Sequence, residues 1–399
     1  MKKYDSYKDI GIDWLGIKSR IPENWSVRRL KDLGDFQSGN FIDANEMDSE
    51  NPYPVYGGNG IRSYSIKYNH DGEYILIGRQ GALCGNINYA SGKFWATEHA
   101  VVVYKKRDYN LTWLGELFKI MNFNQYSLSA AQPGLAVDRL RRLELPVPPF
   151  SEQTAIAQYL DTKTQAIDKK VNLLEKKIGY YKELRKSIIN ETVTKGLDKN
   201  VKLKDSGIYY ISSIPEHWLI QRIKDKFKIG RGRVISQEEL IEEGMFPVYS
   251  SQTENNGCLG YINSYDFDKD LLTWTTDGAN AGTVFRRKGK FNCTNVCGTL
   301  IPIRMDLDLD FMVYALQESA THNKRIDTNG AKIMNNEMAV IQVTFPPIEE
   351  QTAIATYLDH KTQTIDKIVT NIQKQIATLK ELRKTLINDV VTGKIKVVE

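Results

Sequence analysis

The sequence predicts a mixed α/β protein made of two similar units, each of which ends in a long helix. Three observations lead to this prediction. The chain repeats itself at an offset of about 200 residues. The repeated end of each unit carries apolar residues at three- and four-residue steps, and the part before it alternates short apolar runs with Gly, Asn, Asp and Ser. With 399 residues, 41% hydrophobic and 26% charged, the chain is long enough for two or three domains.

The first part of each unit is divergent, but it keeps recognisable anchors. The segment IPENW at 21–25 returns as IPEHW at 214–218, an offset of 193. YPVY at 53–56 returns as FPVY at 246–249, and GKF at 92–94 returns at 289–291, now at an offset of 197. The insertions therefore lie between these anchors, and we expect them in loops.

The last part of each unit is a near duplicate. Segment 148–194 returns as 346–392 at an offset of 198, with about 29 of the 47 positions identical. Two copies of one fold in one chain imply approximate two-fold symmetry. We therefore divide the chain into 1–149, 150–197, 198–347 and 348–399, an α/β domain and a helix in each unit.

The duplicated segments have the pattern of long helices. Two prolines end the preceding element, because Pro cannot continue a helix, and Glu152 and Glu350 then favour a helix N-terminus. A helix of about 40 residues would be about 60 Å long, and it cannot bury its apolar side alone. The two helices are thus expected to pair as an antiparallel coiled coil. The residues predicted to line that pair are Ile156, Leu160, Ile167, Val171, Leu174 and Ile178, with Ile354, Leu358, Ile365, Val369, Ile372 and Ile376 in the second copy.

Short apolar runs in the divergent parts indicate strands. They lie at 74–77 and 100–104 in the first unit, and at 271–275 and 298–302 in the second. Short helices are expected at 113–121 and 311–318. Each divergent part is thus predicted to hold a small curved sheet.

Catalytic signatures are missing from the sequence. It has no GxxxxGK[ST] phosphate loop, no Asn-Pro-Pro-Tyr or Asp-Pro-Pro-Tyr motif of amino-methylating enzymes, and no carboxylate cluster typical of a nuclease. Cys293 and Cys297 could form half of a zinc site, but they lack suitably spaced histidines, so buried strand cysteines are the favoured interpretation. Four cysteines, no apolar run of membrane-spanning length and no signal peptide lead us to expect a cytoplasmic protein.

Polar side chains near glycine-rich turns suggest that the loops bind DNA. Arg, Gln and Asn can read base edges through paired hydrogen bonds, whereas Lys, Ser and Thr hold phosphates. The net charge of +5 permits a polyanionic partner. The candidates are Asn59, Arg62, Arg79, Gln80, Asn86, Lys93 and Thr97 in the first unit, and Arg231, Arg233, Ser251, Gln252, Asn255, Asn280, Lys290 and Asn292 in the second.

The duplicated block resembles a known family. The pattern P-P-x-x-E-Q-T-A-I-A-x-Y-L-D at 148–161 and 346–359, the Ile-Asp pairs at 167–168 and 365–366, and the two Ile-Pro-x-x-Trp openings are similar to the specificity subunit of type I restriction-modification systems. The resemblance covers almost the whole chain. It implies that 1–149 and 198–347 are two target recognition domains, joined by the two helices in a pseudo-two-fold arrangement.

The resemblance also implies a function and partners. The chain would read a bipartite, asymmetric site on double-stranded DNA, without being an enzyme and without a cofactor or metal of its own. Two modification subunits would carry S-adenosylmethionine and methylate adenine, and restriction subunits would use ATP and Mg²⁺. The length of the helix pair would fix the unread spacer between the half-sites. The alternative is a duplicated coiled-coil scaffold that binds proteins instead of DNA.

Overall fold

The structure, a computed structural model, describes residues 2–16, 18–81, 83–127, 134–328 and 330–397. The chain forms two compact units. Unit 1 consists of Met1–Glu175 and Lys374–Glu399, and unit 2 of Lys176–Gln373. Helices α4 (Phe150–Lys195) and α7 (Ile348–Val391) are continuous across this division, so each unit contains one α/β part and a portion of both helices. The mixed α/β class and the long helices predicted from the sequence are confirmed.

The described residues of unit 1 form two four-stranded sheets and two small ribbons. One sheet has the order β6-β5-β10-β7, with β5 and β10 parallel, and the other has the order β4-β11-β8-β9 and is antiparallel. The ribbons are β1-β2 and β12-β3. The strands are β1 (Tyr7–Ile10), β2 (Ser19–Pro22), β3 (Ser26–Arg29), β4 (Gly34–Ser38), β5 (Tyr53–Gly57), β6 (Gly60–Ser65), β7 (His70–Asp71), β8 (Tyr74–Gly78), β9 (Ile87–Ala90), β10 (Lys93–Ala96), β11 (Ala100–Lys105) and β12 (Glu144–Val147). The short helices are α1 (Leu30–Leu33), α2 (Leu111–Met121) and α3 (Val137–Arg141).

Unit 2 repeats the strand order of unit 1. Its sheets are β18-β17-β22-β19 and β16-β23-β20-β21, and its ribbons are β13-β14, β15-β26 and β24-β25. The strands are β13 (Leu203–Ile208), β14 (Ile211–Pro215), β15 (Leu219–Arg222), β16 (Phe227–Arg231), β17 (Phe246–Tyr249), β18 (Cys258–Ile262), β19 (Phe267–Asp268), β20 (Leu271–Thr275), β21 (Val284–Arg287), β22 (Lys290–Cys293), β23 (Cys297–Pro302), β24 (Arg325–Asp327), β25 (Gly330–Lys332) and β26 (Gln342–Phe345). The helices are α5 (Leu309–Asn323) and α6 (Asn335–Val340).

The strands and helices predicted inside the divergent parts are present, but the sheet content is larger than expected. The predicted strands are β8, β11, β20 and β23, and the predicted short helices are α2 and α5. The prediction of one small sheet in each unit is wrong, because each unit has two four-stranded sheets. The strands of the additional sheet are short and interrupted by Gly, Tyr and Ser, so their apolar alternation is too weak to be recognised.

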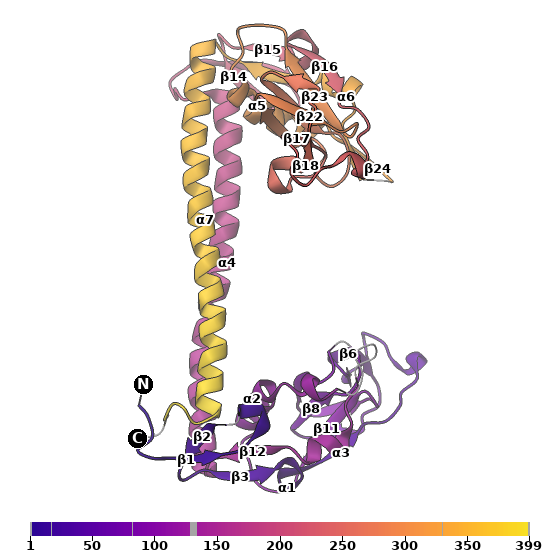
Figure 1. The fold of residues 1–399 in the computed structure, drawn as a ribbon, viewed down its shortest axis with the longest axis vertical. Helices are drawn as coiled ribbons and strands as arrows, with labels where there is room; N and C mark the ends of the chain where they lie inside the picture. Colours follow the sequence, from indigo (N-terminus) through magenta and orange to yellow (C-terminus); the bar gives the residue numbers. More distant parts are fainter. Residues whose placement is uncertain (1, 17, 82, 128–133, 329, 398–399) are drawn as a thin grey trace. The chain divides into compact units, whose positions relative to one another are not determined.

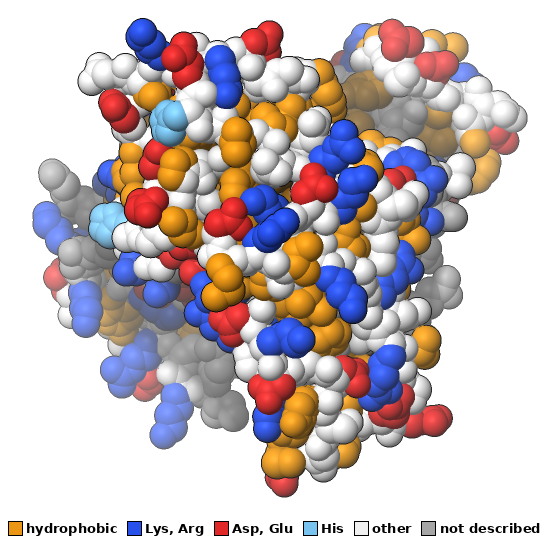
Figure 2. All heavy atoms as spheres, turned by 90° about the horizontal axis from the view of Figure 1, so that it is seen from above, with side chains coloured by type: hydrophobic (Ala, Val, Ile, Leu, Met, Phe, Trp, Pro, Cys, Tyr) orange, Lys and Arg blue, Asp and Glu red, His pale blue; other side chains and the backbone are white. Residues whose placement is uncertain are grey.

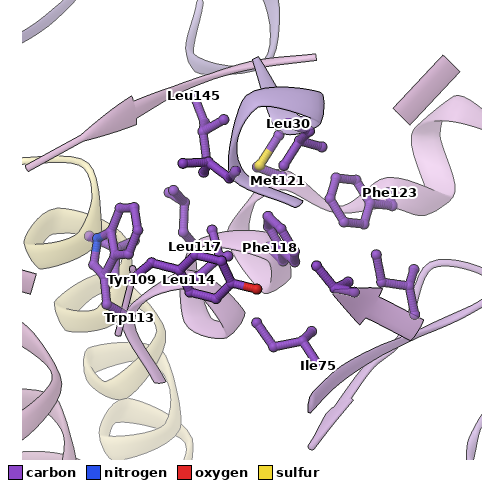
Figure 3. Packing of buried hydrophobic residues seen from close by; sticks show 14 of the residues in the cluster. Leu30, Ile75, Tyr109, Trp113, Leu114, Leu117, Phe118, Met121, Phe123 and Leu145 are labelled. Atoms are coloured by element: carbon purple, nitrogen blue, oxygen red, sulfur yellow. The ribbon is translucent and has the colours of Figure 1, made fainter. Parts of the chain in front are cut away.

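The main core of each unit joins the α/β part to the ends of the two long helices. In unit 1, α2 fills the centre with Trp113, Leu117 and Phe118, which are fully buried (Figure 3). The same core includes Ile156 and Leu160 of α4 and four residues near the end of α7, namely Leu386, Ile387, Val390 and Val391. The core of unit 2 has the matching composition, with Trp218 and Trp274 beside Ile354 and Leu358 of α7 and Ile189 and Val193 of α4.

Helices α4 and α7 lie side by side within each unit and run in opposite directions (Figure 1). In unit 1, Arg383 Nε of α7 lies 3.0 Å from Asp168 Oδ1 of α4. In unit 2, Arg185 Nε of α4 lies 3.2 Å from Asp366 Oδ1 of α7. Both members of the second pair are related to those of the first by the offset of 198, so each unit contains the same ion pair with the helices exchanged.

The twelve apolar residues predicted for the helix pair are all buried or half-buried. Their surroundings differ along the helices, because the first residues of each set also belong to the core of an α/β part. The two copies are not equally covered either. Ile365 is 6% exposed, whereas its counterpart Ile167 is half-buried at the edge of the unit 1 core. Among the described residues, no helix combines the length and the apolar composition that a membrane span requires.

Candidate nucleic-acid interface

The Glu-Gln pair of the repeated motif attaches each long helix to its α/β part. Gln153 Oε1 accepts a hydrogen bond from the backbone N–H of Asn110 (2.9 Å), and its amide nitrogen donates to the carbonyl of Pro148 (3.0 Å). Gln351 makes the same two contacts with Asp308 (2.9 Å) and Pro346 (2.9 Å).

The residues that receive these contacts begin the short helices of the α/β parts. Asn110 and Asp308 are the N-cap residues of α2 and α5, and their side chains accept backbone N–H groups at the start of each helix. Both glutamines are therefore buried and join a long helix to an α/β part through hydrogen bonds, a role that the sequence analysis missed. We call these contacts the glutamine brackets.

The glutamates of the motif add a second bracket, and here the partners differ between the units. Glu152 accepts hydrogen bonds from the Tyr4 hydroxyl and from Asn24 Nδ2 (3.2 Å). Burial, strengthened by the bond to Glu152, raises the pKa of Tyr4. Glu350 instead contacts His217 Nε2 (2.6 Å) and accepts from Trp218 Nε1 (3.0 Å). These brackets hold the α/β parts on the helices and thereby position the loops described below.

The loops of unit 1 enclose a hollow of about 610 Å³. Three predicted residues, Asn59, Arg62 and Gln80, line it together with Leu83, His99 and glycines at 57, 58, 60 and 81. The hairpin between β5 and β6 is short, and Gly60 at φ 97 allows its tight turn. Arg62 is exposed and has no ion-pair partner among the described residues. The hollow therefore presents an uncompensated guanidinium beside two amide groups.

The remaining candidates of unit 1 are divided between surface and interior. Asn86 is exposed and donates to Asn59 Oδ1 (2.6 Å), which extends the polar rim of the hollow. Arg79 is half-buried and donates to the Ser38 hydroxyl (3.0 Å). Lys93 is exposed, with its Nζ 4.7 Å from the centre of the Tyr68 ring, and the Tyr68 hydroxyl raises the pKa of this lysine.

Unit 2 presents a longer polar loop where unit 1 has its short hairpin. Ser251 and Gln252 are half-buried, Asn255 is exposed, and the amide of Gln252 donates to the Cys258 carbonyl. Asn280, from the turn after β20, donates to Thr253 Oγ1 (3.3 Å) and so brings a second loop against the first. The structure thus places these four predicted residues in one region of unit 2.

The basic candidates of unit 2 are largely engaged in contacts within the protein. Arg233 forms ion pairs with Glu239 (2.8 Å) and Asp266 (3.2 Å), and it lowers the pKa of the Glu239 carboxyl. Arg231 donates to Asn335 Oδ1 (3.1 Å). Lys290 repeats the position of Lys93, because its Nζ lies 4.5 Å from the centre of the Tyr265 ring.

Two predicted DNA contacts are contradicted by burial. Thr97 and Asn292 are both fully buried. Asn292 accepts from the backbone N–H of Asp266 (2.9 Å) and donates to the carbonyl of Ser264 (2.8 Å), so it holds a turn in place. These side chains cannot touch a surface ligand. The sequence marked them as polar residues near turns but could not show that they point inward.

Asn256 extends the polar loop of unit 2. It follows the candidate Asn255 and is exposed, and at an offset of 197 it corresponds to Asn59, with Gly257 corresponding to Gly60. The sequence analysis missed two tyrosines that the structure places at these sites. Tyr68 and Tyr265, the ring partners of Lys93 and Lys290, correspond at the same offset.

No single basic patch dominates the visible surface. On the face drawn in Figure 2, Lys and Arg side chains are interspersed with acidic and apolar ones. Within the described part of the chain, no group of three or more His, Cys, Asp or Glu side chains could hold a metal ion. Cys293, the last residue of β22, and Cys297, the first residue of β23, are buried free cysteines.

Sequence comparison assigns the chain to a family. Residues 22–177 and 215–378 each match the family described as type I restriction modification DNA specificity domain, which together is most of the chain. The chain belongs to the type I restriction-modification specificity subunits. It is 42% identical over 164 residues to the type I restriction enzyme EcoprrI specificity subunit of Escherichia coli, a match that covers 40% of each protein. It is 37% identical over 164 residues to the MpnII specificity subunit of Mycoplasma pneumoniae, covering 41% of this chain and 48% of that one. The matched segments thus span less than half of either relative.

Solved structures share the fold of this specificity subunit. A chain from a structure concerned with complex assembly and conformational transition of a type I restriction-modification system superposes with a TM-score of 0.73 at 14% identity, covering 94% of this chain and 99% of the other. The HsdS subunit from Thermoanaerobacter tengcongensis gives a TM-score of 0.55 at 16% identity, with coverage of 94% and 98%. At these identities the likeness concerns the fold.

Proposed function

We propose that the chain reads a bipartite, asymmetric sequence on double-stranded DNA, with one half-site for each unit. The observation that carries this proposal is the contrast between frame and loops. The two units share their strand order, the glutamine contacts and the Lys–Tyr pairs, whereas the loops at 57–60 and 250–257 differ in length and in side chains. A common frame with different loops is expected of two readers of different sequences.

The side chains of the loops are suited to two kinds of DNA contact, with base edges and with phosphates. Asn59, Gln80 and Arg62 around one hollow, and Asn255 with Asn280 in the other unit, offer the amide and guanidinium groups that bond adenine and guanine edges in the major groove. Lys93 and Lys290, each over a tyrosine ring, are suited to phosphates. Each unit then combines a few specific contacts with a sequence-independent one.

We further propose that catalysis and cofactors reside in partner subunits. Two modification subunits would bring S-adenosylmethionine, and restriction subunits would bring ATP and Mg²⁺. Helices α4 and α7, which both units share, would set the spacer between the half-sites and offer their exposed faces to the partners. The chain alone is expected to show neither methylation nor cleavage.

Methylome sequencing of a host that carries this chain with its modification subunit tests the proposal. The expected result is one methylated motif with two specified parts and an unspecified spacer. Duplex binding measured between about 50 and 200 mM salt tests DNA contact separately, since neutralised phosphates make affinity fall steeply with salt. Duplex binding that does not depend on salt concentration, together with an unmethylated genome, would instead favour the protein-binding scaffold.

A further inference from the structure

The loop at 250–257 in unit 2 is an expansion of the unit 1 hairpin. In unit 1, four residues, 57–60, separate the paired Tyr56 and Ile61. In unit 2, eight residues, 250–257, separate Tyr249 and Cys258, which form the corresponding pair. The expansion places Thr253, Asn255 and Asn256 on the surface. A loop of this length needs internal support if it is to present side chains in a fixed geometry.

The backbone of this loop has an unusual conformation. Asn255 (φ 48), Asn256 (φ 55) and Gly257 (φ 78) are three consecutive residues in the left-handed region. Asn tolerates this region better than most residues, but single left-handed residues are the rule and successive ones are not. Such a conformation persists only where surrounding contacts hold it.

Arg287 supplies those contacts from below. This arginine, the last residue of β21, is 1% exposed. Its guanidinium lies between two rings, 3.6 Å from the Tyr249 ring centre and 4.4 Å from that of Phe285. Nη1 donates to the carbonyl of Asn256 (2.7 Å), and Nε donates to the Thr273 hydroxyl (3.0 Å).

Gly257 fits closely against the same guanidinium. A Cβ at this position would lie 2.8 Å from Arg287 Nη2 and 3.1 Å from the Gln252 carbonyl oxygen, so any larger residue would displace the guanidinium, and its side chain would strain the backbone at φ 78. Nη2 is buried and has no hydrogen-bond partner among the described residues. Burial of a guanidinium with an unsatisfied donor is costly, and it lowers the pKa of Arg287. The buried guanidinium of Arg287 thus lowers stability, which points to a role outside the core.

In unit 1, an alanine occupies the position that corresponds to Arg287. Arg287 pairs with Leu271 across β20 and β21, and the equivalent pair across β8 and β9 is Tyr74 with Ala90. Ala90 is buried in a small apolar cluster, and the hairpin above it is the short one. The long loop and the buried arginine thus occur together in one unit and are both replaced in the other.

We propose that Arg287 is a positioning residue for DNA specificity: it cannot touch DNA, but it fixes the Asn255–Asn256 loop so that its amides meet base edges in one orientation. This inference rests on the proposed function. It assigns the base-reading role in unit 2 to the tip of this loop, Asn256 included.

The test compares two adjacent arginines in the full chain, assembled with its modification subunit. Arg287→Gln removes the brace, and Arg286→Gln is the matched control, because Arg286 bonds Asp270 (2.9 Å) and Asp310 (2.5 Å) and does not contact the loop. Competition binding uses duplexes that carry the methylome-derived site or single base changes in either half. Arg62→Ala, in the hollow of unit 1, identifies which half-site unit 1 reads.

Arg62→Ala is expected to impair recognition of the unit 1 half-site only. At the other half-site, Arg287→Gln is expected to reduce discrimination between the correct and the altered bases by about 10-fold or more. At the unit 1 half-site, its discrimination should stay within about twofold of that of the unaltered chain. Arg286→Gln should leave both halves within about twofold. Unchanged discrimination in Arg287→Gln, or an equal loss at both halves, overturns the inference. If the unaltered chain itself does not distinguish the duplexes, the proposed function fails instead.

A second pair of variants keeps the test decisive if Arg287→Gln does not fold. Gly257→Ala leaves Arg287 in place but forces a Cβ against Nη2. Gly289→Ala is its control, since Gly289 has a similar φ of 72 and no atom within 4 Å of its added Cβ. The inference is supported if Gly257→Ala loses discrimination at the unit 2 half-site and Gly289→Ala does not. It is contradicted if the two variants behave equally.

Discussion

The two units differ most beneath their loops, where each has a small second cluster. In unit 1 this cluster is apolar and includes Ala90, Ala96 and Ala100. At the offset of 197, unit 2 has Arg287, Cys293 and Cys297 in their places, all three buried. The strands that carry these residues pair in the same order in both units. The same frame therefore accommodates either set of residues, and the longer loop occurs in the unit that has the buried arginine.

A second difference concerns the helices that both units share. The sequences of α4 and α7 agree at about 29 of the 47 repeated positions, yet positions with the same residue are not always equally buried. Ile365 is 6% exposed, whereas Ile167 is half-buried. In unit 2, Tyr314 of α5 reaches Asp359 (2.7 Å) and Thr362 (3.2 Å) on α7, which adds cover close to Ile365. Identical residues of the two repeated helices thus acquire different environments from the α/β parts beside them.

This difference predicts unequal costs for one substitution made at equivalent places. Ile365→Asp buries an unpaired carboxylate and should cost about 3–5 kcal/mol in the free energy of unfolding. Ile167→Asp should cost about 1–2 kcal/mol, because its carboxylate can remain partly hydrated. Chemical denaturation, with hydrogen exchange to assign the loss to a unit, measures both values.

Leu173→Asp is the control for those variants. Leu173 lies on α4 and is 58% exposed, so the substitution should change the free energy of unfolding by less than about 0.5 kcal/mol. Equal costs for the two isoleucine variants would show that the environments of the helix pair do not differ as the burial indicates.

The glutamine brackets predict a smaller and nearly equal effect in the two units. Gln153→Ala and Gln351→Ala each remove one buried and one partly buried hydrogen bond and leave a backbone N–H without its acceptor, so each should cost about 2–3 kcal/mol. Gln351 also donates to the carbonyl of Asp306 (3.2 Å), so the cost of Gln351→Ala is expected at the upper end of this range. Thermal unfolding measures the loss.

Gln165→Ala controls for the bracket variants on the same helix. Its side chain is exposed and contacts only Asp161 one turn away (2.7 Å), so its loss should cost a few tenths of a kcal/mol. A bracket variant no more harmful than Gln165→Ala would mean that the motif does not join helix and α/β part.

The sequence was sufficient for the elements whose signals are local. Proline pairs and apolar spacing located both long helices, and short runs of Val, Ile and Leu located β8, β11, β20 and β23. The second sheet of each unit was not predicted, because strands of two to six residues interrupted by Gly, Tyr and Ser have no clear hydrophobic period. Repetition itself carried more information than propensity, since it indicated two units of one fold.

The candidate site was predicted less well, for a physical reason. Whether a polar residue beside a turn points outward depends on packing between segments that are distant in sequence. Thr97 and Arg62 both lie near Gly-rich turns, and only the fold places one in the interior and the other at the hollow. Arg233 was chosen for its charge, but its compensation by Asp266 from another segment is a tertiary contact. Loop composition therefore indicated DNA binding without identifying the side chains that are free to perform it.

The smallest expected effect comes from the repeated ion pair, and it offers the closest comparison of the two units. Asp168–Arg383 and Asp366–Arg185 have similar distances, 3.0 and 3.2 Å, and similar exposure, with half or more of each aspartate side chain accessible. Exposed pairs contribute little because water and salt screen them, so double-mutant cycles on each pair should give coupling energies of about 0.2–1 kcal/mol. The two couplings should agree within about 0.5 kcal/mol and should both fall when ionic strength rises from about 0.05 to 1 M. Asp168→Asn with Arg383→Gln, and Asp366→Asn with Arg185→Gln, complete the cycles without adding charge. A coupling present in one unit and absent from the other would show that the helices, although equivalent in sequence, are not packed equivalently in solution.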